Sequence, residues 1–246
     1  MQFFAASTYF LRTVVAYILL YCAAVGFAEG LTSENIVGYA TSELADGNKL
    51  VGAQFLPVSG EGYDIQKIVA AGSDVESYVT LQTLTPGGKA KEIFSWDTWL
   101  YVESGDAKWI DDKGIATRTF QPGEALWVSG QAGYTIQTAG QVGTEDVVAS
   151  LVDGNVAINN PFPVKVNIQD IVATGADVES YVTLQTLTTG GKAKEIFSWD
   201  TWLYVEAGDA KWIDDKGIAT RDFDPGEGLW VSGQAGYTLR IPAPTL

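Results

Sequence analysis

The chain has 246 residues, with 30 acidic side chains against 15 basic ones, and its formal net charge is −15. It contains no histidine and one cysteine, Cys22. An acidic surface repels phosphate backbones, which argues against a nucleic-acid partner, and the absence of imidazole excludes Ser-His-Asp catalysis and histidine-ligated zinc.

The first 28 residues have the pattern of a secretory signal peptide. Arg12 precedes an apolar run over residues 13–24, and the small residues Gly26 and Ala28 follow. About a dozen apolar residues are short for the roughly 20 that a membrane-spanning helix needs, although a retained anchor is the alternative. We therefore expect cleavage after Ala28, a secreted or cell-surface protein, and no retained transmembrane segment. Cleavage would also remove Cys22 and with it any disulfide.

Most of the remaining chain consists of two nearly identical segments. Residues 65–135 match residues 168–238 at an offset of 103, and only eight pairs differ. Upstream the match weakens, although GNKLVGAQFLPV (47–58) still aligns with GNVAINNPFPV (154–164) after a four-residue gap. Such self-similarity indicates an internal duplication. We divide the chain into a signal peptide (1–28), a first unit (29–143) and a second, duplicate unit (144–246). Asymmetric contacts are expected in residues 50–64 and 157–167.

Within the first unit, short apolar runs bounded by glycine-containing turns predict β-strands. In chain order these are residues 36–41, 50–56, 77–84, 90–96, 99–103, 108–111, 125–129 and 134–138. Asp64 can cap a helix in which Ile65, Ile68 and Val69 share a face and which Gly72 ends, and residues 167–175 repeat this pattern. Pro86-Gly87 suits the centre of a type II turn. The predicted fold is all-β: two tandem duplicated β-sandwich or barrel-like units, each with one short helix.

Several short motifs carry a resemblance to a known group of proteins. They are NIVGYA (35–40), NNPFPV (159–164), GDAKWID (105–111), FQPGEALWV (120–128) and FDPGEGLWV (223–231). In this set the chain resembles uncharacterised secreted β-rich repeat proteins of the Planctomycetes and Verrucomicrobia group, surface modules with a proline-glycine-glutamate-glycine-aromatic motif. The resemblance implies a secreted or cell-surface β-domain and brings no catalytic residues with it.

The segment KEIFSWDTWLYVE occurs twice without change, at 91–103 and 194–206. If it is one continuous strand, Phe94 and Trp96 lie on one face, while Trp99 and Tyr101 lie on the other. That second face can stack a sugar ring or a partner protein. The candidate ligand-binding residues are therefore Trp99, Tyr101, Trp202 and Tyr204. Alternatively, a turn at residues 97–98 lets all these aromatic side chains enter the core.

Two acidic loops are candidates for weak calcium binding, since oxygen ligands suit that ion. They contain Asp106, Asp111 and Asp112 in the first unit and Asp209, Asp214 and Asp215 in the second. The spacing differs from that of an EF-hand, and the alternative is a hairpin whose acidic side chains face water.

The expected function is that of a secreted or cell-surface structural or interaction protein without catalytic activity, metal or cofactor. Its expected partners are other surface proteins, further copies of itself or extracellular polysaccharide. The alternative is a carbohydrate-binding module that uses the paired aromatic faces. A glycoside hydrolase comes third, because among 30 acidic residues some carboxylate pair always has a workable separation.

Overall fold

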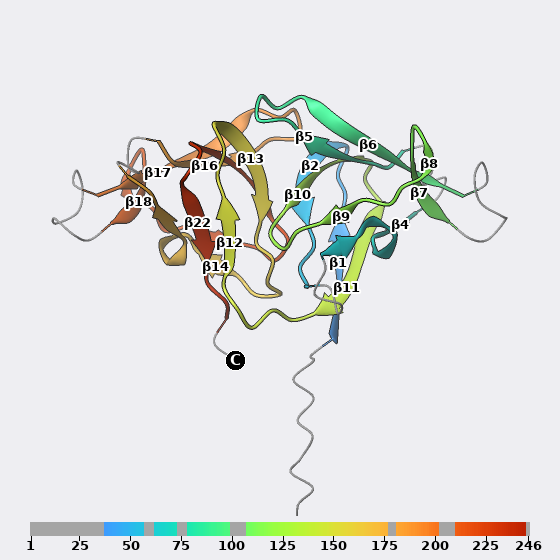
Figure 1. The fold of residues 1–246 in the computed structure, drawn as a ribbon, viewed down its shortest axis with the longest axis horizontal. Helices are drawn as coiled ribbons and strands as arrows, with labels where there is room; N and C mark the ends of the chain where they lie inside the picture. Colours follow the sequence, from blue (N-terminus) through green and yellow to red (C-terminus); the bar gives the residue numbers. More distant parts are fainter. Residues whose placement is uncertain are drawn as a thin grey trace, which may run out of the picture. The chain divides into compact units, whose positions relative to one another are not determined.

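The computed structural model describes residues 37–56, 62–72, 78–98, 107–176, 181–201 and 210–244. Val37–Leu246 form one compact unit, and the expected signal peptide lies outside the described residues. The described chain is all-β and consists of antiparallel sheets joined by turns (Figure 1). The predicted fold class is confirmed at this level.

The first half, residues 37–141, contains a six-stranded sheet in the order β2-β10-β5-β6-β7-β8, a three-stranded sheet β1-β11-β4, and the small pair β3-β9. The strands are β1 (Val37–Glu43), β2 (Gly47–Gly52), β3 (Tyr63–Asp64), β4 (Val69–Ala71), β5 (Thr80–Leu84), β6 (Ala90–Asp97), β7 (Lys108–Asp111), β8 (Gly114–Ile115), β9 (Thr119–Phe120), β10 (Ala125–Gly130) and β11 (Thr135–Gln141).

The second half, residues 147–244, has the same strand order, with sheets β13-β21-β16-β17-β18-β19, β12-β22-β15 and β14-β20. Its strands are β12 (Val147–Ser150), β13 (Gly154–Asn159), β14 (Val166–Asn167), β15 (Val172–Thr174), β16 (Thr183–Leu187), β17 (Ala193–Asp200), β18 (Lys211–Asp214), β19 (Gly217–Ile218), β20 (Asp222–Phe223), β21 (Gly228–Gly233) and β22 (Thr238–Ile241).

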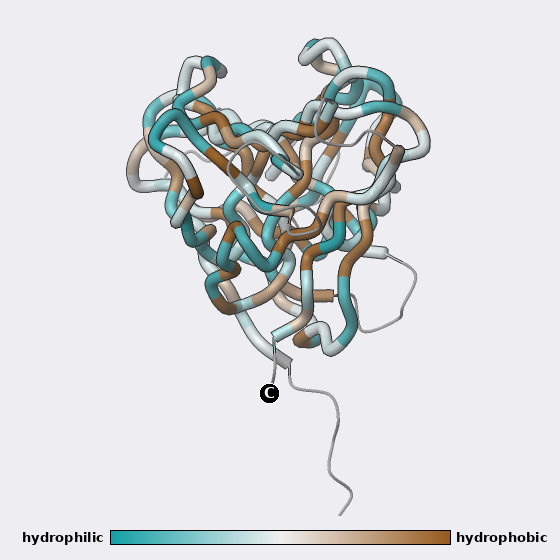
Figure 2. Tube along the Cα trace, turned by 90° about the vertical axis from the view of Figure 1, so that its left-hand side faces the viewer, coloured by the Kyte–Doolittle hydropathy of each residue, from teal (hydrophilic) through white to brown (hydrophobic). Residues whose placement is uncertain are grey.

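Each half is sandwich-like, because its larger and smaller sheets enclose one hydrophobic core. In the first half, Leu81 and Val128 of the six-stranded sheet belong to the same buried cluster as Ala70 and Ile136 of the three-stranded sheet. Strand alternation explains this placement, since inward and outward side chains follow each other along a strand. Figure 2 shows apolar segments of several strands gathered inside the body. The second half has an equivalent cluster.

The repeated aromatic segment contributes to both cores as far as the structure describes it. Phe94 and Trp96 of β6 are buried, as the alternation predicts. The ring centroids of Trp96 and Trp109 lie 5.0 Å apart in an edge-on arrangement, and the pair Trp199–Trp212 repeats it. The indole N–H of Trp109 donates to the carbonyl of Ile68 at 2.7 Å, so its polar atom is satisfied inside the core.

The predicted helix after Asp64 is only a single 3-10 turn, η1 (Ile65–Lys67). Asp64 caps it as expected and accepts a hydrogen bond from the Gln66 backbone N–H at 2.9 Å. The helix does not continue to Gly72, because residues 69–71 form β4 and pair with β11. The second half repeats this arrangement with η3 (Ile168–Asp170) followed by β15. Sheet pairing supplies the backbone hydrogen bonds that a longer helix would have made.

The side chain of Gln66 in η1 fastens the turn to the end of the larger sheet. Its Nε2 donates to the carbonyls of Trp109 and Ala116 at 2.9 and 2.8 Å, and its Oε1 accepts from the Trp109 N–H at 3.0 Å. Gln169 makes the same three contacts with Trp212 and Ala219. One amide therefore satisfies three backbone groups in each half.

The two halves meet along β2, β10, β13 and β21, and their contacts are reciprocal. The Gly52 N–H donates to the Gly226 carbonyl at 3.1 Å, while the Asn159 N–H donates to the Gly123 carbonyl at 2.9 Å. Isolated bridges join residues 51 to 227 and 124 to 158. A small cluster of Leu50, Ala125 and Ala157 fills the junction. The junction therefore consists of both backbone hydrogen bonds and apolar contact.

Candidate functional site

The ligand-binding residues predicted from the sequence, Trp99, Tyr101, Trp202 and Tyr204, lie outside the described residues. The strand predicted at residues 99–103 falls there too. Among the other six tryptophans, four are core side chains: Trp96, Trp109, Trp199 and Trp212. The remaining two, Trp127 and Trp230, are half-buried and point outward from the larger sheets.

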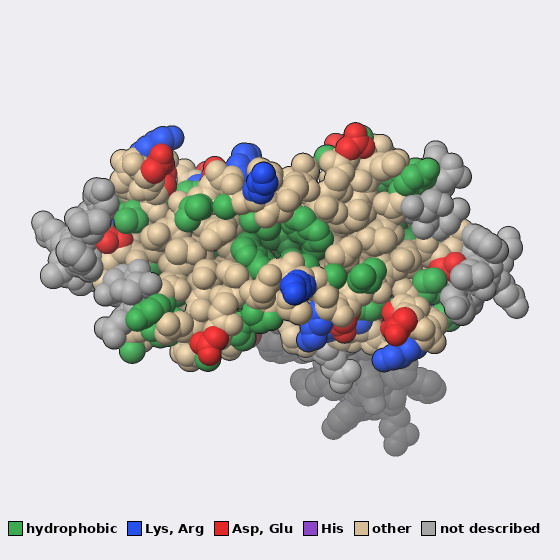
Figure 3. Space-filling model, turned by 90° about the horizontal axis from the view of Figure 1, so that it is seen from above, with side chains coloured by type: hydrophobic (Ala, Val, Ile, Leu, Met, Phe, Trp, Pro, Cys, Tyr) green, Lys and Arg blue, Asp and Glu red, His purple; other side chains and the backbone are tan. Residues whose placement is uncertain are grey.

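Trp127 and Trp230 line one groove of about 520 Å³ between the two halves. Its lining comes in matched pairs from both halves: Asn48 and Asn155, Leu84 and Leu187, Gly87 and Gly190, Gly88 and Gly191, and the two tryptophans, with Gln82 and Ala90 in addition. Seen from above in Figure 3, hydrophobic side chains gather in the middle of this face. The groove is thus built from both halves, with seven lining residues from the first half and five from the second.

Strand register explains why the indole of Trp127 faces the groove. Trp127 pairs with Leu50 on one side and Gln82 on the other, so these three side chains share the outer face of the sheet. The inner face carries Leu126 and Val128, which are buried. The other half covers this outer face at Leu50, next to the junction. At Trp127 and Gln82 the same face lines the groove. The apolar pattern of residues 125–129 predicts a strand here but does not indicate which face remains open.

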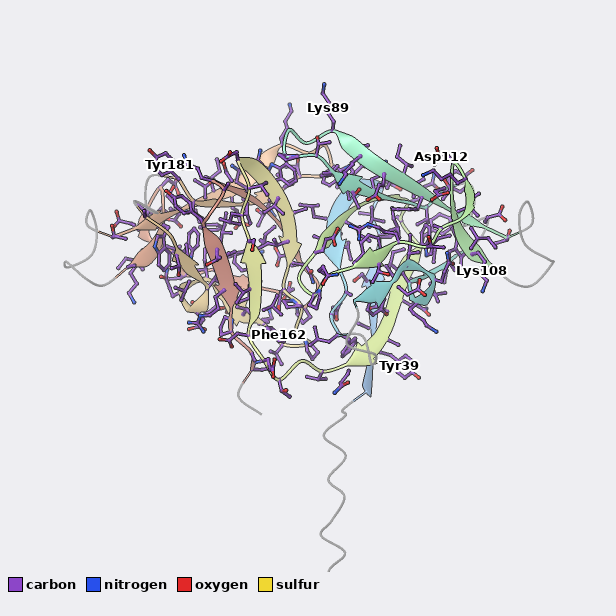
Figure 4. All side chains as sticks on the ribbon, in the orientation of Figure 1. Tyr39, Lys89, Lys108, Asp112, Phe162 and Tyr181 are labelled. Carbon is purple, nitrogen blue, oxygen red and sulfur yellow. The ribbon has the colours of Figure 1, made fainter. Side chains whose placement is uncertain are left out.

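The β5–β6 hairpin forms one wall of the groove. Its tip lies against the indole of the other half, because a Cβ on Gly88 would be 3.7 Å from Cζ2 of Trp230. The β16–β17 hairpin of the second half repeats this contact, since a Cβ on Gly191 would be 3.6 Å from the indole of Trp127. Figure 4 shows Lys89 at the tip of the β5–β6 hairpin pointing away from the body. The Pro86 carbonyl accepts hydrogen bonds from the Asn155 backbone N–H and side-chain Nδ2 at 3.2 and 3.0 Å, which ties the wall to the other half.

The prediction of a type II turn at Pro86-Gly87 is wrong. Positive φ falls on Gly88, at 77°, and not on Gly87. The Gly88 N–H donates to the Thr85 carbonyl at 2.8 Å, and the strand register shifts between Thr83 and Leu84. This is the pattern of a tight turn followed by a left-handed glycine in a bulge, which the Gly-Gly sequence accommodates as well as the predicted turn.

The chemistry of the groove suits an uncharged ligand with flat apolar faces. Each described residue that lines it is uncharged. The indoles of Trp127 and Trp230 offer apolar surface with a polar N–H, and Asn48, Gln82 and Asn155 bring amide groups to the same space. Indole faces with neighbouring amides can stack a ring and hydrogen-bond its hydroxyl groups.

The acidic loops contain hairpin turns where the structure describes them. Asp111 Oδ1 accepts a hydrogen bond from the Lys113 N–H at 2.8 Å, and Asp214 repeats this contact with Lys216 at 2.7 Å. Asp106 and Asp209 lie outside the described residues. Within the described ranges, no three acidic, histidine or cysteine side chains gather in a metal-binding arrangement.

Carboxylates gather instead around one arginine in each half. Arg118 donates to Glu92 at 3.2 Å and to Glu124 at 2.6 Å, and Thr83 donates to Glu92 at 2.7 Å. Burial opposes ionisation of Glu92, but the hydrogen bonds from Thr83 and Arg118, together with the positive charges of Arg118 and Lys91, outweigh it and lower its pKa. In the second half, burial raises the pKa of Glu227 despite its 2.6 Å contact with Arg221. Each cluster fastens the larger sheet to the loop before β10 or β21.

The chain matches no protein-family model, no curated protein and no solved structure at a significant level. In the ranges that the structure describes, no helix has the length and apolar character needed to cross a membrane.

Proposed function

We propose that the chain is an exported, non-catalytic interaction protein made of two tandem duplicated β units, which together form one binding groove. The signal peptide is residues 1–28, the first unit is 29–143 and the second is 144–246. The near-identity of residues 65–135 and 168–238, which differ at only eight pairs, supports the duplication, and so does the shared strand order. The resemblance to secreted β-rich surface modules agrees with this proposal.

The observation that carries the binding function is the matched composition of the groove. Trp127 and Trp230 face it from different halves, and Asn48 and Asn155 accompany them. Large, half-exposed indoles are common where proteins bind ligands and partners, because they combine a wide apolar face with a hydrogen-bond donor. A surface with only a solubilising role has no need to gather two of them in one hollow.

The ligand class that the groove favours is a neutral polysaccharide, which makes a carbohydrate-binding module the second, more specific candidate. Sugar rings have apolar faces that stack on indoles and hydroxyl groups that bond to amides. The uncharged lining offers nothing to pair with an ionised sugar, and the net charge of −15 opposes acidic polymers. This assignment moves the aromatic site from Trp99 and Trp202 to Trp127 and Trp230.

The test is affinity electrophoresis and tryptophan fluorescence with a panel of soluble neutral polysaccharides. We expect retardation and a fluorescence change for the wild type, and loss of both in the double variant Trp127→Ala/Trp230→Ala. The matched control is Trp99→Ala/Trp202→Ala, which removes the same number of indoles and should keep binding. Loss of binding in the control alone would return the site to the predicted residues. Release of reducing ends from any bound polymer would contradict the non-catalytic assignment.

Failure of the wild type to bind any neutral polysaccharide would remove the carbohydrate candidate but leave a protein partner possible. Crosslinking through a photoreactive group placed at Lys89, at the tip of the groove wall, then decides the broader proposal (Figure 4). Capture of a surface protein whose binding is lost in the Trp127→Ala/Trp230→Ala variant would support it. Capture that is unaffected by the variant would overturn the groove as the binding site.

A further inference from the structure

The outer face of each larger sheet continues beyond the groove. In the first half, Gln82 of β5 lines the groove, and Ile93 of β6 lies directly opposite Gln82 in the strand register. Directly paired residues of neighbouring strands point to the same face of a sheet, so Ile93 adjoins the surface that Trp127 and Gln82 form. Ile93 is 53% exposed. The surface that lines the groove therefore extends onto an open part of the sheet.

A second row of paired residues crosses the same face up to the last strand of the sheet. The register leads from strand to strand through Asn48, Ser129, Thr80, Ser95, Ile110 and Ile115. Thr80 is two residues from Gln82 along β5, so this row shares the face of Ile93. Neighbouring strands lie about 4.8 Å apart, so the four steps from β10 to β8 carry this face about 19 Å beyond the strand of Trp127.

Both rows consist of uncharged side chains, although the chain as a whole has a net charge of −15. Charged residues enter in the next row, in which Asp97 and Lys108 lie opposite each other. The solvent-facing side of an antiparallel sheet usually carries polar residues. Here the outer faces carry every exposed isoleucine of the described chain: Ile93, Ile115, Ile196 and Ile218. A neutral face with apolar side chains at its surface fits the same uncharged ligand as the groove.

The second half presents the equivalent face. Trp230 pairs with Gln185, and Ile196 lies opposite Gln185 on the next strand. A row from Asn155 to Ile218 repeats the second row of the first half. The groove is therefore continued by a neutral, partly apolar face in both halves.

The halves are related by an approximate two-fold axis that passes through the groove. The hairpin at Gly88 approaches Trp230, and the hairpin at Gly191 approaches Trp127. Reciprocal contacts of this kind are those of a two-fold arrangement, and matched residues of both halves line the groove. A two-fold axis places equivalent features on opposite sides of itself, so the two open faces leave the groove in opposite directions. Figure 3 shows smaller hydrophobic patches on both sides of the central one.

We infer that the groove is the middle of a longer track that binds an internal segment of a linear neutral polysaccharide across both halves. This inference rests on the proposed function and adds the length of the bound segment. A cavity of about 520 Å³ suits a ligand of drug size, whereas the two outer faces give further sugar rings a place on either side of it. The isoleucine side chains can lie against the apolar faces of the rings, and the hydroxyl groups of Thr80 and Ser95 can bond to those of the sugar.

The two-fold arrangement also determines how the polymer lies. A polysaccharide chain has a direction, and turning it round exchanges the part that meets the first half with the part that meets the second. The paired tryptophans, glutamines and isoleucines of the two faces are the same residue types, so both orientations offer equivalent contacts. A chain that crosses both faces also leaves its two ends outside the groove. The track therefore binds within a chain and does not require a free end.

The test compares the binding of short and long fragments by isothermal titration calorimetry. The probes are pullulan, β-mannan and mixed-linkage β-glucan, each as size-fractionated oligosaccharides with the reducing end free or converted to an alditol. Ile93→Ser/Ile196→Ser removes one isoleucine from each face. Val69→Ser/Val148→Ser is the matched control, because these two valines are exposed on the smaller sheets.

For a polysaccharide that binds, we expect the isoleucine variant to lose affinity about tenfold for the longest fragments, since it removes two apolar contacts of ordinary size. Its loss should stay below about twofold for the shortest fragment that the wild type binds. The control variant should match the wild type at every length, and fragments with free and converted reducing ends should bind alike.

Unchanged affinity of the isoleucine variant for long fragments would overturn the track and leave the groove as the binding site. An equal loss for short and long fragments would also overturn it, because the isoleucines would then act at the groove itself or on the fold. Binding that requires a free reducing end would contradict the internal position of the bound segment. A wild type that binds none of the three polysaccharides would remove the carbohydrate candidate and the track with it.

Discussion

Replacing Gln66 with glutamate tests how the 3-10 turn is fastened to the larger sheet. The substitution keeps the shape of the side chain but exchanges its NH₂ for a carboxylate oxygen. That oxygen would face the carbonyls of Trp109 and Ala116, which now accept hydrogen bonds at 2.9 and 2.8 Å. The bond from the Trp109 N–H to Oε1 can persist. Two favourable contacts therefore become repulsive while packing is unchanged.

The expected loss of unfolding free energy is about 2 to 4 kcal/mol. Each lost hydrogen bond contributes roughly 0.5–1.5 kcal/mol, and the Ala116 carbonyl, which loses the donor from Gln66, adds a desolvation cost of about 1–3 kcal/mol. The Trp109 carbonyl keeps the Ala116 backbone N–H as a donor at 2.9 Å. Gln66 is half-buried, so a carboxylate can turn partly towards water, and the full sum is not reached. The loss should shrink as the pH falls through the pKa of the new carboxyl, because the protonated acid regains one donor.

The assay is urea unfolding followed by tryptophan fluorescence at neutral and acidic pH. Gln169→Glu, the same change in the second half, should show a similar loss, since its contacts are equivalent. Gln131→Glu adds the same charge at an exposed turn and should stay within about 0.5 kcal/mol of the wild type. A loss below about 1 kcal/mol in both Gln66→Glu and Gln169→Glu would refute the reasoning.

Three further predictions concern other parts of the chain. The lowered pKa of Glu92 means that its ionised form stabilises the fold above its usual value of 4.5, and that this contribution is lost as the pH falls through the folded-state pKa. Glu92→Gln should therefore be less stable than the wild type near neutral pH and converge with it in acid, and curves that stay parallel would contradict this sign. Gly88→Ala should lower the free energy of unfolding by about 1–2 kcal/mol, since φ is 77° there. Gly87→Ala should leave it nearly unchanged, because the nearest atom to a Cβ there is 4.0 Å away. An equal loss in both variants would contradict the placement of the left-handed position at Gly88 alone. If residues 1–28 are the signal peptide that we propose, the mature protein should begin at Glu29, and mass spectrometry that finds a mature peptide containing Arg12 would contradict the proposal.

Local patterns in the sequence predict the strands because strand formation leaves a period of two in the residues themselves. The prediction at 108–111 coincides with β7, and that at 90–96 is one residue short of β6. The predicted helix shows what local spacing cannot specify. Ile65, Ile68 and Val69 have helical spacing, but β11 offers residues 69–71 a strand partner that no local pattern reveals.

The near-identity of two segments determined that both halves would meet similar packing demands, and strand alternation determined that Phe94 and Trp96 would be buried. Only the tertiary structure decided what covers the outer face of each larger sheet. There the other half approaches Leu50 closely, while Trp127 remains half open beside the groove. Alternation tells which side chains share a face, but it carries no information on what lies opposite. That depends on contacts between residues more than 100 positions apart, as between Ala53 and Asn159.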